Sequence, residues 1–317
     1  MRFKEITVIL PRAKGATLLS TVVLRRLRHK YPESLIQCIS KFPELLEGLN
    51  YVDRICDWDD VLNFEGAIMD REVIDLNGTL DFQPNRRPAP IHLIELLCKR
   101  AKVNNDFLGP ECNLSGKEII SAQSEIGLNG SRHGLPVILI TTRTSTVNKE
   151  WSCDSWKELV MHFGDRVRWL HVGDFHKPLI NGVEYLSLTP RQSIAVAGLV
   201  DGVVTLDTFL LHAAASQRRQ RGGVVVLLGS SHPNCVSYDT FRNVYFQSLE
   251  CQPCGRPFSQ FDLKRLSDGQ PEPWPNGKAK KWECEHVDCM KAIKVEYVAT
   301  AIESEIFAKK IRNEMHV

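Results

Sequence analysis

The chain lacks any apolar run near the roughly 20 residues that a membrane-spanning helix requires. The opening Met-Arg-Phe-Lys-Glu leads into a short strand-like apolar run with no small-residue cleavage site after it, so we expect a first β-strand here and no export signal. Low-complexity tracts are missing, and the only internal repetition is a rough duplication of one strand–helix pattern. We therefore expect a cytoplasmic protein, which can still associate peripherally with a membrane.

An excess of charge of one sign is absent as well, because 40 Lys and Arg face 38 Asp and Glu, for a net charge of +2. This overall balance indicates no polyanion partner. Basic residues nevertheless gather in short runs at residues 25–30, 86–87, 218–221 and 278–281. Two interpretations stay open for these runs: cations on solvated helix ends, which the helix dipole favours, or contacts to the phosphates of a nucleotide, a lipid headgroup or DNA.

A length of 317 residues exceeds the usual size of one core, so two domains are expected, and 43% hydrophobic residues suffice to build them. Apolar runs and helical spacing alternate along the chain, which is typical of parallel sheets covered by helices. Predicted strands cover residues 6–10, 35–39, 54–57, 72–76, 136–140, 167–172, 202–206 and 223–228. Predicted helices cover residues 17–28, 90–99, 155–163, 193–197 and 210–216.

This pattern predicts an α/β fold with two Rossmann-like domains that face a central cleft. We assign residues 1–130 to the first domain and 131–297 to the second, with the polar stretch 113–134 as the linker. A closing helix starts at residue 298 and can cross back to the first domain within residues 298–317. Ligands of such folds bind at the carboxyl ends of the parallel strands.

Four of the ten cysteines stand close together near the C-terminus, as Cys251-Gln-Pro-Cys254 followed by Cys284 and Cys289. A CxxC turn can point two thiolates at one metal, and a second pair supplies the remaining corners of a tetrahedron. The cytosol keeps thiols reduced, which favours a metal over disulfides. The spacing predicts a metal-binding finger that holds zinc or iron; the alternative is four ordinary thiols.

Polar residues follow three of the predicted strands. After the first strand comes a glycine that allows close backbone approach, just ahead of a helix whose free N–H groups suit an anion; this loop contains Lys14, Gly15 and Ala16. The first strand of the second domain leads to hydroxyls and cations suited to phosphate oxygens, at Thr141, Thr142, Arg143 and Lys149. A later strand–helix junction carries Asp207, Thr208, Leu210 and His212. Turn caps, a helix cap and a core histidine are the structural alternatives.

These segments combine into longer motifs. Lys14-Gly15-x-x-Leu18-Leu19-Ser20-Thr21 opens the chain, and Thr141-Thr142-Arg143 precedes Lys149-x-Trp151. Asp207-Thr208-x3-His212-x-Ala214-Ala215 follows, and Cys-x-Pro-Cys…Cys…Cys-Met-x-x-Ile ends the series. In this order, and over nearly the whole chain, they resemble the heptosyltransferase-type glycosyltransferases of family 9.

The resemblance implies a GT-B fold and transfer of a sugar, a heptose or a related one, with inversion from a nucleotide-sugar donor such as ADP-heptose. Thr141, Thr142 and Lys149 match the positions that hold the donor's phosphates, and the backbone from Thr208 to Leu210 completes that cradle together with His212. The acceptor hydroxyl would belong to a saccharide, a protein or a modified DNA base. The resemblance also allows a homo-oligomer.

Two positions depart from the family pattern. Ala16 stands where the family has an aspartate that can act as general base, and Phe209 replaces a glycine. Loss of a general base typically costs about 10²–10⁴-fold in rate. Loop position makes Asp75, Asp81 and Asp174 the candidate bases. The alternative is a non-catalytic protein that binds a nucleotide-sugar or serves in assembly.

The cysteine cluster makes a measurable prediction. Because four thiolates share one metal in this interpretation, Cys251→Ser should lower the metal content and destabilise the second domain. Elemental analysis of the purified protein, together with thermal unfolding, checks both effects. Wild-type protein that contains neither zinc nor iron in stoichiometric amount would contradict the prediction.

Overall fold

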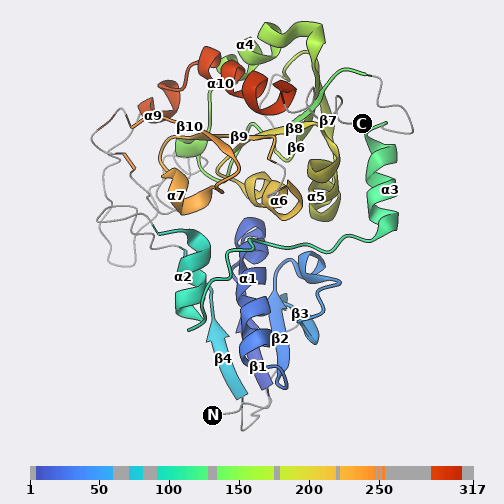
Figure 1. Cartoon of the computed structure of the whole chain (residues 1–317), viewed down its shortest axis with the longest axis vertical. Helices are drawn as coiled ribbons and strands as arrows, with labels where there is room; N and C mark the ends of the chain where they lie inside the picture. The colour runs from blue at the N-terminus through green and yellow to red at the C-terminus, as the bar shows by residue number, and fades with distance from the viewer. Residues whose placement is uncertain are drawn as a thin grey trace.

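The computed structural model describes residues 5–59, 71–80, 91–127, 134–174, 179–218, 222–247, 249, 252–253 and 287–308. Two parallel sheets lie one above the other (Figure 1), one before the predicted boundary at residue 130 and one after it. We call the first sheet with its helices, up to residue 112, the first lobe, and residues 134–308 the second lobe. The predicted α/β class with parallel sheets is confirmed.

The first sheet has four strands in the order β3-β2-β1-β4. Central strand β1 pairs in parallel with both neighbours, so that Glu5 lies opposite Leu35 on one side and Arg71 on the other. Because all four strands are parallel, their carboxyl ends meet at one edge, where α1 (Lys14–Lys30) begins. The strands are β1 (Glu5–Ile9), β2 (Leu35–Ser40), β3 (Arg54–Asp57) and β4 (Arg71–Asp75).

The second sheet has six strands in the order β10-β9-β8-β5-β6-β7, all parallel. Every residue of β8 and β9 is buried, as expected for the apolar runs Gly-Val-Val-Thr-Leu and Val-Val-Val-Leu-Leu. The chain order reverses between β5 and β8, which creates the crevice where open parallel sheets bind ligands. The strands are β5 (Val137–Ile140), β6 (Arg168–Val172), β7 (Val183–Leu186), β8 (Gly202–Leu206), β9 (Val224–Leu228) and β10 (Arg242–Tyr245).

Helices cover both faces of the second sheet. α5 (Pro190–Leu199) and α6 (Phe209–Arg218) lie between this sheet and the first lobe, whereas α4 (Cys153–Phe163) and α10 (Val295–Ile302) cover the far face (Figure 1). The buried side chains form two apolar clusters. One combines the first lobe with α5 and α6, and the other contains α4, α10 and the far face of the second sheet. The two lobes therefore share one continuous core.

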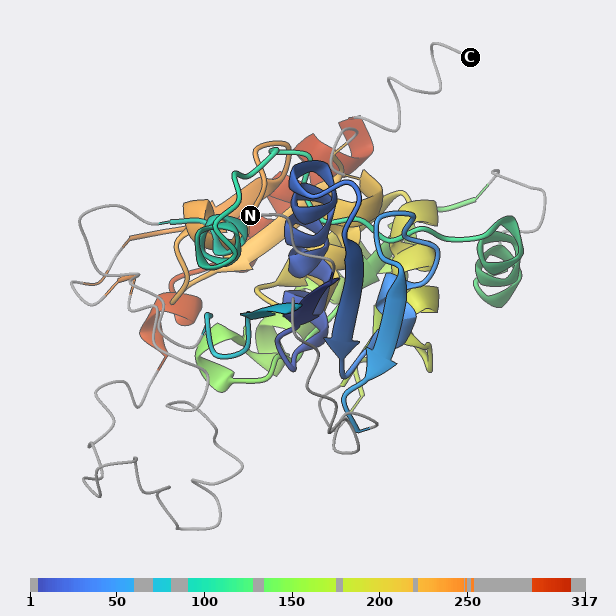
Figure 2. The same cartoon turned by 90° about the horizontal axis from the view of Figure 1, so that it is seen from below.

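The lobe interface has a polar clamp beside this core. Arg191 of α5 donates to both carboxylate oxygens of Glu118, at 2.5 and 2.9 Å, and to the backbone oxygens of Glu44 and Asn113. Glu118 belongs to α3 (Gly116–Glu125), which lies at the periphery beside α5 (Figure 2). The 3-10 turn η1 (Pro43–Leu46) provides the Glu44 contact. One guanidinium thus connects the second lobe to the first lobe and to the linker.

The basic run at the end of α1 is structural. Arg25 makes two bonds to Asp106, at 2.8 and 3.0 Å, and one to Glu111 at 2.9 Å. Arg28 pairs with Asp53, and Lys30 donates to the backbone oxygen of Lys102. Arg218 is buried and donates to four backbone oxygens near α5 and α6. The runs 86–87 and 278–281, and residues 219–221 of the third run, lie outside the described residues.

Several sequence predictions need correction. The predicted linker contains α3, which a capping box between Ser115 and Glu118 begins. α1 begins at Lys14, so the expected loop residues 14–16 form its first turn. β7, β10 and two short helices, α7 (Pro233–Val236) and α9 (Asp288–Lys291), were not predicted. α2 (Leu93–Arg100) is shorter than expected.

The closing helix begins earlier than expected, at Val295, and residues 309–317 of the closing segment lie outside the described residues. α10 contacts α4, β9 and β10, and a π-helical turn, η6 (Glu303–Phe307), follows it. Ile306 of η6 packs on Gly202 so closely that a β-carbon there would lie 2.2 Å from it. The described part of the closing segment therefore belongs to the second lobe.

Within the described residues, no helix is both long and apolar enough to cross a membrane.

Candidate functional site at the meeting of two helix ends

The crevice between β5 and β8 brings together two of the predicted segments. Thr141 and Thr142 follow β5, and Asp207 follows β8 directly. Lys149 ends the 3-10 turn η3 (Val147–Lys149) after the first of these loops. Its ammonium lies 2.7 Å from Oδ2 of Asp207, and each side chain is only 9% exposed. The sequence placed these groups in separate motifs, and the fold joins them in one ion pair.

Asp207 is ionised in this pair. Burial alone would raise the pKa of its carboxyl, but the nearby Lys149 charge and its hydrogen bond, with a further bond from the Ser231 hydroxyl at 2.6 Å, lower the pKa below its usual value. The neighbouring Ser230 hydroxyl accepts a bond from the Asn148 amide at 3.1 Å. The loop after β9 is thereby tied to both the β5 and the β8 loops.

In the hydroxyl-rich loop after β5, the threonine hydroxyls form hydrogen bonds within the second lobe. Thr142 contacts Nε2 of His171 through its backbone N–H at 3.2 Å and its hydroxyl at 3.0 Å. The Thr141 hydroxyl donates to the backbone oxygen of Arg143 at 3.4 Å. Arg143 itself is 43% exposed and lies 3.5 Å from the Glu150 carboxylate. Both threonines are buried, so their hydroxyls shape the loop.

His212, in the first turns of α6, is buried and its Nδ1 lies 3.0 Å from the Tyr238 hydroxyl. Burial lowers the pKa of His212 to about 4, although the Asp207 charge acts in the opposite direction. The ring is therefore neutral at neutral pH. When the Tyr238 hydroxyl donates to Nδ1, the ring proton sits on Nε2.

The N-terminus of α1 meets the N-terminus of α6. A β-carbon at Gly15 would lie 3.0 Å from the ring of His212 and 3.6 Å from Cα of Phe209. Glycine is therefore needed at residue 15 for the two helices to approach this closely. α1 has no side-chain cap at Ala13, and neither helix carries an acidic residue in its first turn. We call this contact, residues 14–17 against 209–212, the helix junction.

The remaining predicted site residues are dispersed. Lys14 is exposed and Ala16 half-buried in the first turn of α1, while Thr208 is half-buried and Leu210 buried beside the junction. Asp75 is exposed at the end of β4, opposite Ile9 of β1 in the sheet register. Asp174 is exposed after β6, on the donor-loop side, since the preceding Gly173 lies next to the Thr141 hydroxyl. Asp81 lies outside the described residues.

Of the four predicted metal ligands, Cys251, Cys254 and Cys284 lie outside the described residues. Cys289, in α9, is buried, and a β-carbon at Gly229 would lie 2.9 Å from its sulfur. Gln252, the residue after Cys251, donates from its side chain to the Gly229 backbone oxygen at 2.9 Å. The described neighbours of both cysteine pairs thus meet at Gly229. Among the described residues alone, no group of three or more metal-binding side chains is found.

Sequence reasoning overlooked two residues that complete the site, Asn148 and Tyr238. Neither belongs to a motif with a recognisable spacing. Arg12, which lies just before α1, stacks on Trp58, with its guanidinium carbon 4.0 Å from the ring centre. Ser231 had a signal, since it lies in the Gly-Ser-Ser-His-Pro loop at the end of an apolar strand, but its bond to Asp207 depends on the fold.

No protein-family model matches the chain, and a search of curated proteins finds no match. Solved structures do match. A family 9 glycosyl transferase from Veillonella parvula superposes with a TM-score of 0.66 at 16% identity, covering 97% of this chain and 98% of that one. The E. coli ADP-heptose LPS heptosyltransferase II gives 0.63 at 14% identity over 96% and 99%. The iron-containing dodecameric glycosyltransferase TibC from enterotoxigenic E. coli gives 0.63 at 16% identity over 98% and 77%.

The chain has the GT-B fold of the heptosyltransferase-type glycosyltransferases. The likeness extends over both lobes and so agrees with the sequence resemblance. In the GT-B frame of this chain, the helix junction and the Lys149–Asp207 pair lie together at the C-terminal edge of the second sheet, facing the first lobe.

The lowered pKa of His212 predicts a specific pH dependence of stability. The unfolded chain binds a proton at His212 near the ordinary pKa of 6.5, whereas the folded chain does so only near 4. The stabilisation is therefore fully present above pH 6.5 and is lost as the pH falls toward 4, by about 2–3 kcal/mol.

Urea unfolding at pH 7 and pH 4.5 measures this effect, with His212→Gln as the comparison. The wild type should lose about 2 kcal/mol more than the variant between the two pH values. An equal loss in both proteins would show that His212 does not titrate in this window.

Proposed function

We propose that this chain is an inverting glycosyltransferase whose donor is a nucleoside diphosphate sugar. The observation that carries the proposal is the helix junction, where two helix N-termini without acidic residues in their first turns meet. Each N-terminus carries roughly half a positive charge and several N–H groups without helical partners. Two such ends repel one another, so an anion between them relieves the repulsion and accepts hydrogen bonds from both.

A diphosphate fits this junction because it has oxygens for several donors at once. Thr208, ahead of the first turn of α6, and His212, in it, contribute a hydroxyl and a neutral imidazole, and Lys149 supplies a cation next to them. When the sugar leaves, negative charge grows on the diphosphate, and fixed N–H donors stabilise that charge without reorganising. Phe209, where the family has a glycine, keeps its backbone N–H. Its side chain leaves less room for a diphosphate to approach the backbone, but no hydrogen-bond donor is lost.

Thr141, Thr142 and Arg143 have a smaller part in the proposal. The threonine hydroxyls are engaged with Arg143 and His171, which supports a role in loop shape. Arg143 is partly exposed, so it can reach a phosphate at the mouth of the crevice. The ion pair of Lys149 with Asp207 sets the position of its ammonium against the β8 loop.

We propose Asp75 as the general base that replaces the carboxylate missing at Ala16. Asp75 follows β4, which is hydrogen-bonded to β1, and β1 leads directly into the first turn of α1. It therefore lies at the same carboxyl edge of the first sheet at which α1 begins, where an acceptor would enter. Asp174 lies on the opposite side, next to the donor loop. Removal of a proton by one base during direct displacement at the sugar carbon gives inversion.

The donor sugar we propose is a heptose or a related sugar carried on ADP or another nucleoside diphosphate, since the structural relatives include an ADP-heptose transferase. The acceptor would be a hydroxyl of a saccharide, a protein or a modified DNA base. The cysteine finger would hold zinc or iron. The contacts of Gln252 and Cys289 with Gly229 support this finger, because they bring the segments that carry the two cysteine pairs to the same place. TibC is iron-containing and dodecameric, and a homo-oligomer is part of the proposal.

One observation favours a second function. Ala16 provides no carboxylate in the first turn of α1, so a non-catalytic protein that binds a nucleotide-sugar or serves in assembly would look the same on the donor side. The two functions differ in turnover and not in binding.

Nucleotide binding tests the donor site. Isothermal titration with ADP should detect a complex, and Lys149→Met should weaken it about tenfold or more, since a cation in contact with phosphate contributes about 1.5–3 kcal/mol. Lys157→Met, on the exposed face of α4, is the matched control. Because Lys149→Met leaves Asp207 buried without its counter-charge, Thr208→Val serves as a milder second variant, with about a three- to tenfold loss. Failure of ADP, UDP and GDP all to bind at millimolar concentration would overturn the proposal.

Turnover separates the enzyme from the non-catalytic alternative. With ADP-heptose as donor, transfer of the heptose to water or to an acceptor, measured as the ADP set free, should be about 10²–10⁴-fold slower in Asp75→Asn while ADP affinity stays the same. Asp174→Asn is the matched control and should retain the wild-type rate. ADP binding without any release by the wild type favours the non-catalytic protein, and equal effects of the two substitutions would reject Asp75 as the base.

A further inference from the structure

The two loops that carry the buried pair of Lys149 and Asp207 are both hydrogen-bonded to the C-terminal part of the chain. On the lysine side, Trp151 follows Lys149 by two residues, and its indole N–H donates to the backbone oxygen of Ile293 at 2.9 Å. Trp151 is buried, and Ile293 comes directly after the short helix α9 that contains Cys289. The lysine loop is therefore bound to the segment that follows the second cysteine pair.

The aspartate side is bound in a corresponding way. Ser231 donates to the Asp207 oxygen that the lysine ammonium also contacts. Two residues before it, the backbone oxygen of Gly229 accepts from the Gln252 side chain at 2.9 Å. Gln252 is buried, and its side-chain oxygen accepts from the Leu249 N–H at 3.0 Å, which fixes the direction of the amide. One carboxamide thus holds the start of the serine loop.

A single segment reaches both sides of the ion pair. A β-carbon at Gly229 would lie 2.5 Å from Sδ of Met290 and 2.9 Å from the sulfur of Cys289, so α9 packs directly on the serine loop. Met290 is joined to Ile293 within one turn, because the Ile293 N–H donates to the Met290 backbone oxygen at 3.2 Å. We call this turn, with the Trp151–Ile293 and Gln252–Gly229 hydrogen bonds, the brace.

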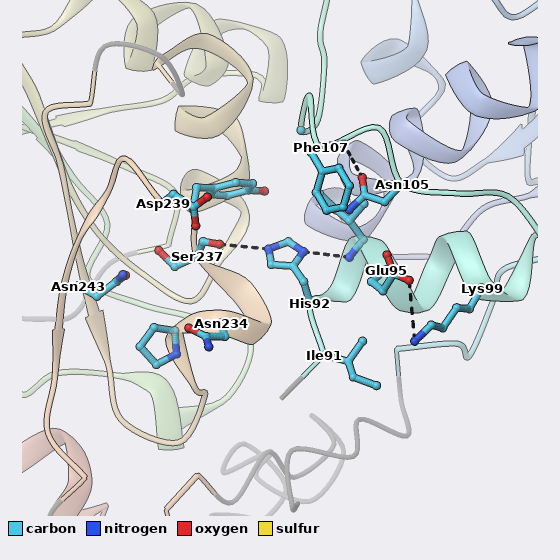
Figure 3. A pocket seen from close by; sticks show the side chains of 14 residues that line it. Ile91, His92, Glu95, Lys99, Asn105, Phe107, Asn234, Ser237, Asp239 and Asn243 are labelled. Carbon is cyan, nitrogen blue, oxygen red and sulfur yellow. Dashed lines mark hydrogen bonds and ion pairs between the residues drawn. The ribbon is translucent and has the colours of Figure 1, made fainter. Parts of the chain in front are cut away.

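The serine loop is also held at its far end. It continues through α7 to Ser237, whose backbone oxygen lies 3.1 Å from Nε2 of His92 in the first lobe. Figure 3 shows the His92 ring between Ser237 and the first turn of α2, where its Nδ1 accepts from the Ile94 N–H. Residues 229–237 are therefore anchored at both ends, which leaves the Ser231 hydroxyl little freedom to move away from Asp207.

The ion pair needs such support. A lysine side chain is long and flexible, so its ammonium takes one position only when its surroundings impose it. A buried ion pair contributes little net stability, and its own attraction is a weak constraint on the two loops. The brace ties both loops to the same turn and so sets the distance between them. Fixed charges of this kind stabilise a leaving group without reorganising.

We propose that Trp151 and Gln252 are positioning residues of the donor site, which fix the Lys149 ammonium and the Asp207 carboxylate through the brace. The inference rests on the proposed function, because that function gives the fixed pair its diphosphate. In this role neither side chain contacts the donor. Trp151 acts through Lys149, and Gln252 acts through Gly229 and Ser231.

Hydrogen–deuterium exchange tests the brace without any ligand. Trp151→Phe removes the indole N–H and keeps an aromatic ring, so peptides that cover residues 147–151 and 229–232 should exchange about tenfold faster. Trp156→Phe is the matched control: its ring lies 5.1 Å from the Trp151 ring, and its indole N–H has no hydrogen-bond partner among the described residues. It should leave both peptides unchanged. Gln252→Met is the second variant and should loosen residues 229–232.

ADP affinity tests the positioning role. Trp151→Phe should weaken ADP binding about three- to tenfold, while Trp156→Phe should bind as the wild type does. A double-mutant cycle separates positioning from general loosening. In the Lys149→Met background, Trp151→Phe should change the affinity by less than about twofold, because the group that it positions is gone. Losses that simply add would overturn the positioning role.

The outcomes separate this inference from the proposed function. Exchange rates in Trp151→Phe and Gln252→Met that equal those of the wild type would overturn the brace, as would equal acceleration by Trp151→Phe and Trp156→Phe. If the wild type binds none of ADP, UDP and GDP, the donor site is rejected, and the exchange measurement still decides whether the brace fixes the two loops. Trp151→Phe is the decisive variant, since Gln252 lies next to Cys251, a predicted metal ligand.

Discussion

The close approach of the α1 and α6 N-termini is the constraint on which the rest of the structure depends. It requires Gly15, because any β-carbon there would press on His212. It also brings the two lobes near enough for α1, α5 and α6 to share one apolar cluster with the first sheet. A GT-B protein whose lobes met elsewhere would keep both sheets yet lose the site, since the candidate residues of each lobe face each other only across this contact. The Arg191 clamp and the His92–Ser237 contact hold the same arrangement from two sides.

The buried pair of Lys149 and Asp207 complements this contact. A buried ion pair contributes little net stability, because desolvation offsets most of its attraction, but loss of one partner is costly. The pair is neutral as a whole, so the positive potential at the junction comes mainly from the helix ends, whose N–H groups are fixed by the backbone. Ser231 and Asn148 add hydrogen bonds that join the loops after β5, β8 and β9. The site is therefore organised before any ligand arrives, which is what electrostatic stabilisation of a leaving group requires.

Sequence reasoning predicted the continuously buried strands correctly. It missed a mostly exposed helix and the contacts between residues that are far apart in the sequence. The apolar runs of β8 and β9 identify buried strands without ambiguity, and the predicted β3 agrees with the structure at both ends. α3 was not predicted, because all of its residues except Ala122 have some exposure and the helix therefore has no apolar face that a sequence pattern can reveal. Its capping box was the available signal. The ion pair and the Tyr238–His212 contact could not be predicted, since they join residues that only the order of the strands brings together.

Ala16 shows how one position can alter the balance of the site. It occupies the third residue of α1, where a carboxylate interacts favourably with the helix dipole by about 0.3–1 kcal/mol and stays ionised. An aspartate there would supply a base but would also cancel part of the positive potential that attracts a diphosphate. Alanine keeps that potential intact and packs its methyl group against the shared apolar cluster. In the function we propose, alanine at this position therefore favours anion binding at the junction, and another carboxylate has to remove the proton. Our candidate, Asp75, would do so without weakening the junction, because it lies at the end of β4, at the sheet edge and outside the first turn of α1.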